Sequence, residues 1–192
     1  RDMGIDPYPA AEYEVTGYST DIKATFVDEA PEGETKGWYT GKPVRIAGRL
    51  MSRRIMGKAS FIELQDSKGR IQVYVSRDDI QTPTAEGETP QTAEQQMYNV
   101  VFKKLLDIGD FIGIEGFVFR TQMGEISIHA QKLTILAKSL RPLPIVKYKD
   151  GVAYDGFNDP EQRYRQRYVD LVVNEGVKDV FLKRATIIRT MR

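Results

Sequence analysis

The feature that most constrains the fold of this chain is a pair of segments in which apolar and polar residues alternate. In residues 59–65, Ile62 and Leu64 alternate with Phe61, Glu63 and Gln65, and in residues 71–76 every second residue is aliphatic. Because successive side chains of a β-strand point to opposite faces, this period of two predicts strands with one buried face. The inward side chains are expected to be those of Ile62, Leu64, Ile71, Val73 and Val75. The segment between them, residues 66–69 (Asp-Ser-Lys-Gly), is typical of a hairpin turn.

Further alternating segments predict three more strands, over residues 44–51, 110–121 and 125–137, with turns at 56–58 and 122–124. Between the third and fourth strands, Val101, Leu105 and Leu106 have helical spacing and predict a short helix over residues 98–106. The order of three strands, one helix and two strands matches the five-stranded Greek-key barrel known as the OB-fold. We therefore expect a mainly β protein, in which an OB-fold barrel has its helix between strands three and four and N- and C-terminal helical segments on either side.

A short helix is expected before the barrel. Ile22, Phe26 and Val27 lie near helical spacing. The hydroxyl of Ser19 or Thr20 is expected to cap this helix, because it can accept a hydrogen bond from a first-turn N–H group.

The C-terminal part is expected to be a linker followed by helices. Residues 142–157 have the pattern of a linker, and a helix is predicted to open at 159–161, where Pro160 suits the first turn. The helical pattern breaks at 174–176 and then continues to Arg192, where it stops in mid-pattern. We therefore expect a fragment of a longer protein. The predicted organisation is an N-terminal helical segment (1–41), an OB-fold domain (42–141), and a linker with the first helices of a further domain (142–192).

The composition excludes several kinds of site. The chain has no Cys, so it has no disulfide, thiolate metal site or cysteine nucleophile. His129 is the only histidine, which excludes a multi-histidine metal site. The Gly-Lys pair in residues 56–60 lacks the other residues of a phosphate-binding loop. We therefore expect no catalytic residue and no metal site. No apolar run approaches the roughly 20 residues of a membrane span, so a cytoplasmic protein without membrane contact is expected.

The net charge of +1 conceals segregated charges. Residues 42–58 carry six basic and no acidic side chains, whereas residues 79–99 carry four acidic and no basic ones. A basic strand and turn are what a surface that follows a phosphate backbone needs. Lys and Arg at a strand edge also prevent edge-to-edge pairing, and composition leaves both interpretations open. Within the acidic region, residues 81–96 contain no aliphatic residue larger than Ala and no aromatic, which predicts a mobile insertion.

Outward residues of the predicted barrel combine an aromatic ring with amide and carboxylate groups. The outward set is Phe61, Glu63, Gln72, Tyr74, Glu125, Ser127 and His129. A ring offers a stacking platform for an unstacked base, and Gln and Glu can hydrogen-bond to the edge of a base. The alternative is that Phe61 only packs against Tyr74 across the strands. His129 has similar alternatives, since it could cap an edge of the core or face solvent.

Several ordered segments resemble the anticodon-binding domain of class II lysyl-tRNA synthetases. The similar segments are residues 49–61, 64–66, 69–75, 124–129, 140–144 and 163–171, together with the opening Gly-Ile-Asp-Pro-Tyr-Pro at 4–9. The resemblance covers nearly the whole chain except the region around 81–96. Aspartyl and asparaginyl enzymes share the OB-fold, but Arg-Arg-Ile-Met-Gly-Lys-Ala (53–59) and Arg-Tyr-Arg-Gln-Arg-Tyr (163–168) resemble the lysine family.

The resemblance implies roles for particular side chains. Phe61 matches the aromatic residue that stacks on the central anticodon uridine, and Gln72 and Glu125 match residues that contact anticodon bases. Arg54 matches the basic residue of the strand-one turn that approaches the anticodon, with Arg53 as the second choice. Further candidate RNA contacts are Arg49, Lys58, Tyr74 and His129.

The resemblance also implies a partner and a parent activity. The partner is the anticodon stem-loop of tRNA(Lys). The whole enzyme activates lysine with ATP and Mg²⁺, transfers it to the tRNA 3′ end, and is expected to be a homodimer. Because this chain ends where the first catalytic motif of the family begins, the fragment is expected to bind RNA without catalysis and without a cofactor of its own. Two alternatives stay open: a general single-strand-binding OB module and a protein-interaction barrel.

Overall fold

The computed structural model describes residues 3–27, 38–82, 87, 89, 92, 95–144, 147–149, 152–154, 156–174 and 176–192. Two compact units make up the chain, residues 1–141 and residues 142–192. The predicted insertion at 81–96 lies largely outside the described residues. The three-part division predicted from the sequence stays a prediction.

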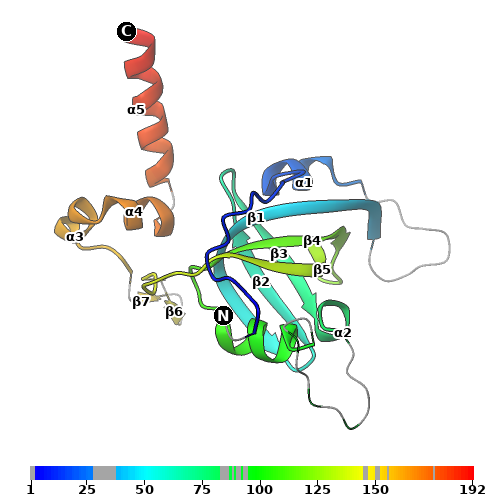
Figure 1. Cartoon of the computed structure of the whole chain (residues 1–192). Coiled ribbons are helices and arrows are strands. Elements are labelled where there is room, and N and C mark those ends of the chain that lie inside the picture. The colour runs from blue at the N-terminus through cyan, green and yellow to red at the C-terminus, as the bar shows by residue number, and fades with distance from the viewer. Residues whose placement is uncertain are drawn as a thin grey trace. The chain divides into compact units, whose positions relative to one another are not determined.

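The first unit is a closed five-stranded barrel (Figure 1). Its strands are β1 (Trp38–Met56), β2 (Ala59–Gln65), β3 (Arg70–Ser76), β4 (Phe111–Arg120) and β5 (Ile126–Ala137). The order around the barrel is β1-β2-β3-β5-β4, in which β3 and β5 are parallel and the other pairs are antiparallel. The predicted mainly β fold and OB-fold barrel are confirmed.

The barrel interior follows the predicted alternation. In β2 and β3 every second residue is buried; the five predicted residues are among them, and Ser60, which was not predicted, is buried as well. Two positions of the barrel require glycine for different reasons, one for its backbone conformation and one for space. Gly57 has φ +67° in the β1–β2 turn, a region that L side chains rarely adopt. A Cβ at Gly116 would lie 1.9 Å from the carbonyl oxygen of His129 on the neighbouring strand, so only glycine fits there.

The predicted helix is present, but its hydrogen-bonding pattern is not that of an α-helix. The segment η1 (Met97–Leu105) is a π-helix, in which Leu106 N–H donates to the carbonyl of Val101, five residues earlier. The wider turn changes which side chains share a face. Val101 and Leu106 are buried, whereas Leu105 is 45% exposed. Tyr98 fills the interior instead, and its hydroxyl lies 2.9 Å from that of Ser60.

The N-terminal helix α1 (Ser19–Thr25) is attached to the barrel. The predicted cap by Ser19 or Thr20 was wrong, because the N-cap is Tyr18 and it makes no side-chain cap. Ser19 is buried and bonds elsewhere: its N–H and hydroxyl both donate to the carboxylate of Asp66 in the β2–β3 turn, at 2.5 and 2.9 Å. A four-residue helix that the sequence did not predict, α2 (Arg77–Ile80), follows β3.

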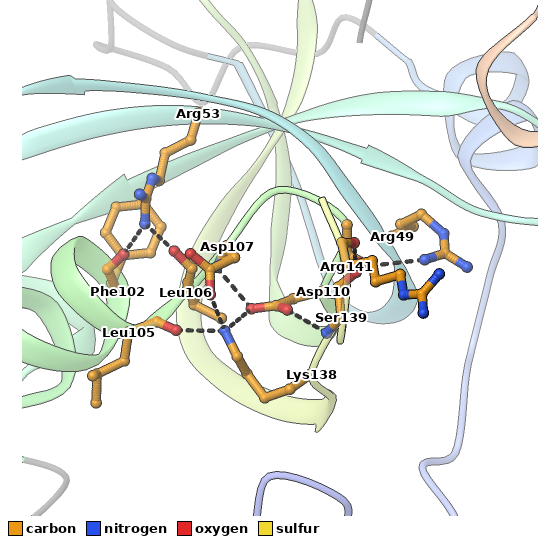
Figure 2. A network of polar contacts seen from close by, with 11 residues as sticks. Arg49, Arg53, Phe102, Leu105, Leu106, Asp107, Asp110, Lys138, Ser139 and Arg141 are labelled. Carbon is orange, nitrogen blue, oxygen red and sulfur yellow. Dashed lines mark hydrogen bonds and ion pairs between the residues drawn. The ribbon is translucent and has the colours of Figure 1, made fainter. Parts of the chain in front are cut away.

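A buried carboxylate ties the ends of two barrel strands together (Figure 2). Asp110 is fully buried and accepts hydrogen bonds from the N–H groups of Asp107 (2.8 Å) and Ser139 (2.7 Å) and from Nζ of Lys138 (2.5 Å). Burial by itself lowers the pKa of Lys138, but its hydrogen bonds to Asp107 and Asp110 outweigh burial and raise that pKa. The network therefore holds a charged pair at the end of η1, next to the start of β4 and the end of β5.

The second unit begins with a hairpin of β6 (Lys147–Lys149) and β7 (Val152–Tyr154), where a linker was predicted. Three helices follow: α3 (Pro160–Arg165), α4 (Arg167–Val173) and α5 (Val177–Met191). Pro160 occupies the first turn as predicted, and Asp159 caps α3 by accepting from Gln162 N–H at 2.8 Å. The interruption of the helix at Gln166, which separates α3 from α4, was not predicted. No helix among the described residues is long and apolar enough to cross a membrane.

The buried Asp170 makes the second unit sensitive to acid. Burial by itself raises the pKa of Asp170, but hydrogen bonds from Asn174 and Arg163 and the charges of Arg163 and Arg167 outweigh burial and lower it. A carboxylate with a depressed folded-state pKa contributes stability above its ordinary pKa of 3.8, and this stability is lost as the pH falls through the lower value.

Acid titration of the helical circular dichroism signal tests this effect in the wild-type chain and in Asp170→Asn. We expect the wild type to lose unfolding free energy more steeply than the variant below pH 4. Parallel pH profiles would contradict the assigned role of Asp170.

Candidate nucleic-acid interface

A pocket of about 450 Å³ lies on the outside of the barrel at β2 and β3. Its lining residues are Lys23, Ser52, Arg54, Phe61, Ile62, Glu63, Arg70, Ile71, Gln72 and Glu125. Four of the five residues predicted for the anticodon site therefore line one pocket: Arg54, Phe61, Gln72 and Glu125. They come from β1, β2, β3 and the turn before β5. The fold therefore brings together residues that are separated by up to 71 positions in the sequence.

Phe61 forms part of the pocket wall and also packs across the strands. Its ring centroid lies 5.3 Å from that of Tyr74, its register partner on β3, and the planes are tilted by 58°. The Arg54 guanidinium carbon lies 5.8 Å from the centroid of the Phe61 ring. Cross-strand packing and a place in the pocket wall therefore coexist at Phe61. Packing against Tyr74 holds the ring in one orientation, as a stacking platform requires.

Gln72 and Glu125 supply hydrogen-bonding groups to the pocket. The amide oxygen of Gln72 accepts from the hydroxyl of Ser127 at 2.9 Å, which fixes the side chain on β3. Ser127 was expected on the outward face, but it is fully buried, and its hydroxyl also contacts the Glu125 carbonyl. The exposed Glu125 side chain pairs with Lys23 of α1, with 3.3 Å between Nζ and Oε1.

A second ion pair lies on the same wall. Arg70 Nη1 is 3.3 Å from Glu63 Oε2, and Arg70 Nε donates to Gln65 Oε1 at 3.0 Å. The pocket therefore combines three cations and two carboxylates around one aromatic ring. The sequence pattern did not predict Lys23 or Arg70 in this site. Arg70 precedes the alternating segment of β3, and nothing in the sequence relates Lys23 to a turn about 100 residues later.

Arg53 and Arg49 donate to backbone carbonyls near the end of η1 and the start of β4 (Figure 2). Arg53 Nη1 donates to the carbonyls of Phe102 (2.5 Å) and Leu106 (2.9 Å), at the C-terminal end of η1. Arg49 Nη1 donates to the Gly109 carbonyl at 2.9 Å. Burial lowers the pKa of Arg49. Neither arginine lines the pocket, so the structure favours Arg54 over Arg53.

The remaining candidates lie outside the pocket lining. Lys58 is exposed in the β1–β2 turn. Tyr74 and His129 are half-buried in an aromatic row, with their ring centroids 4.9 Å apart. His129 Nε2 lies 2.7 Å from Asp79 Oδ2. Burial raises the pKa of the Tyr74 hydroxyl, and the negative charge of Asp79 adds to this effect.

Comparisons with known proteins agree with this geometry. Residues 44–136 match the family model of the OB-fold nucleic acid binding domain, tRNA anti-codon type. The whole chain is 59% identical to part of a lysine–tRNA ligase of Porphyromonas gingivalis, of which it covers 30%. It is 58% identical to that of Azobacteroides pseudotrichonymphae, covering 35%, and 54% identical over 193 aligned residues to that of Christiangramia forsetii, covering 30%.

The chain thus spans about a third of the length of these curated relatives, and it matches their N-terminal part. The strand order, the pocket and the matched residues lead to one assignment. Residues 44–136 are similar to the OB-fold nucleic acid binding domains of the tRNA anticodon type, and the chain as a whole is similar to the N-terminal part of lysine–tRNA ligases.

Proposed function

We propose that the pocket on β2 and β3 reads the anticodon bases of tRNA(Lys). The observation that carries this proposal is that Arg54, Phe61, Gln72 and Glu125 line a single pocket. These four side chains supply the functions that recognition of an unstacked base requires: a ring for stacking, an amide and a carboxylate for the base edge, and a guanidinium for a phosphate. OB-folds bind oligonucleotides on the strand 2–3 face, where this pocket lies.

The whole protein is proposed to be a lysine–tRNA ligase, as its curated relatives are named. In this proposal it activates lysine with ATP and Mg²⁺, transfers it to tRNA(Lys), works in the cytoplasm and forms a homodimer. In the part of this chain that the structure describes, no group of three or more His, Cys, Asp or Glu side chains is placed to hold a metal ion. The role that we propose for this chain is RNA binding.

Titration of fluorescent RNA hairpins tests anticodon reading directly. We expect the chain to bind a hairpin with a UUU anticodon in its loop more tightly than the same hairpin with a shuffled loop. Equal affinities would favour the general single-strand-binding module. A lack of RNA binding at low salt would favour a protein-interaction barrel.

Salt dependence tests the contribution of phosphate contacts. If the cations around the β1–β2 hairpin neutralise two or three phosphates, log K should fall against log [salt] with a slope of about −1.5 to −2 for a single-stranded loop. Affinity should then fall roughly eight- to sixteenfold between 50 and 200 mM salt. Affinity that is flat over this range would rule out phosphate tracking by this surface.

A further inference from the structure

One side chain of the pocket, Lys23, comes from outside the barrel. We propose that Lys23 is a positioning residue, which orients the carboxylate of Glu125 so that Glu125 discriminates between RNA bases. This inference rests on the proposed function and adds helix α1 to the reading site. Lys23 itself is not expected to contact the RNA.

Helix α1 is anchored well enough for such a role. The carboxylate of Asp66 in the β2–β3 turn accepts two hydrogen bonds from Ser19, at the start of the helix. Ile22, adjacent to Lys23, is 7% exposed and belongs to the barrel core. An ion pair of 2.6 Å between Asp21 and Lys68 joins the helix to the same turn. The backbone beside Lys23 is therefore held in place by both buried and polar contacts.

The backbone of Glu125 is also fixed. Its N–H donates to the Thr121 hydroxyl at 3.0 Å, and its carbonyl accepts from Thr121 N–H at 2.9 Å. Lys23 Nζ then meets Oε1 of the Glu125 side chain at 3.3 Å. An ionised carboxylate has about four acceptor sites, so one ammonium contact leaves others for the N–H groups of a base. The ion pair thus restricts the orientation of the Glu125 carboxylate and leaves some of its acceptor sites available to the RNA.

Stability alone does not account for this ion pair. The two side chains are 38% and 51% exposed, and exposed pairs of this kind contribute little to the free energy of unfolding. The pair does have a geometric consequence within the pocket, because it holds one oxygen of the Glu125 carboxylate in place.

Binding of a panel of hairpins tests the proposal. The panel contains a UUU loop and three loops in which one uridine is replaced by cytidine, and the readouts are the ratios of Kd values and the salt slope for UUU. For Lys23→Met we expect the largest discrimination ratio of the wild type to fall about threefold or more, with an unchanged salt slope. Lys23→Arg should retain the ratio. In a Glu125→Gln background, Lys23→Met should cause no further loss.

Lys132→Met is the matched control, because Lys132 forms an exposed ion pair with Glu115 (3.6 Å) that lies outside the pocket lining. It should leave the ratios unchanged. An equal weakening of all four loops by Lys23→Met, with a shallower salt slope, would show a direct phosphate contact and overturn the positioning role. Unchanged ratios would overturn it as well. Failure of the unsubstituted chain to discriminate among loops would instead refute the proposed function, so the two failures are distinguishable.

Discussion

Replacing Asp110 with alanine is expected to lower the free energy of unfolding of the barrel by about 2–6 kcal/mol, because two backbone N–H groups lose a buried acceptor, at about 1–3 kcal/mol each. Asp110 is fully buried, and its carboxylate receives the Lys138 ammonium and two backbone N–H groups (Figure 2). The variant leaves both N–H groups without their acceptor. Urea denaturation followed by far-UV circular dichroism measures the loss.

Asp107→Ala is the matched control for this experiment. Asp107 also contacts Lys138, at 2.8 Å, but its side chain is 70% exposed, so we expect a loss of no more than about 1 kcal/mol. Similar losses for the two variants would contradict the view that burial of the Asp110 carboxylate makes this network important. The effect should also depend on pH. Because the folded-state pKa of Lys138 is raised, its contribution is full below the ordinary pKa of 10.5 and is lost as the pH rises through the higher value.

Replacing Phe61 with alanine is expected to weaken binding of the UUU hairpin by about 1–3 kcal/mol, the usual contribution of one base stacked on an aromatic ring. In affinity this is a loss of roughly 5- to 150-fold. The fold should be little affected, because Phe61 is half-buried and a cross-strand pair such as Phe61–Tyr74 contributes about 0.2–1 kcal/mol. Fluorescence anisotropy gives the affinity, and thermal unfolding of the same preparations gives the stability.

Tyr164→Ala controls for the loss of an exposed aromatic ring, since Tyr164 lies in α3 of the second unit and is 77% exposed. It should change neither affinity nor stability appreciably. If Phe61→Ala unfolded the barrel while the residual folded protein kept its affinity, Phe61 would be a packing residue only, and the stacking assignment would fail.

The barrel could be predicted from the sequence because each strand carries its own signal. The alternation of Ile62, Leu64, Ile71 and Val73 reports burial on one face, and the turn at 66–69 sets the hairpin register. The elements that were missed lack such local signals. The capping prediction for Ser19 failed because a residue 47 positions away, Asp66, takes up its hydroxyl.

The candidate site was predictable to the extent that its residues alternate on strands. Phe61 and Gln72 were found by their outward positions on β2 and β3, and both line the pocket. Arg53 and Arg54 are adjacent and chemically identical, so only their contacts separate them: one bonds the end of η1 and the other lines the pocket. Lys23 could not be found from the sequence, since its position depends on how α1 docks on the barrel.

The most direct test of the account is a map of backbone amide chemical shifts in the ¹⁵N-labelled chain during titration with the UUU hairpin. If the pocket reads the anticodon, the largest changes should occur at Arg54, Phe61, Gln72 and Glu125 and their neighbours, with Lys23 among them. Phe61→Ala should reduce these changes at the same RNA concentration. If the largest shift changes occurred on another surface and the shifts of these amides stayed the same, this pocket would not be the RNA-reading site.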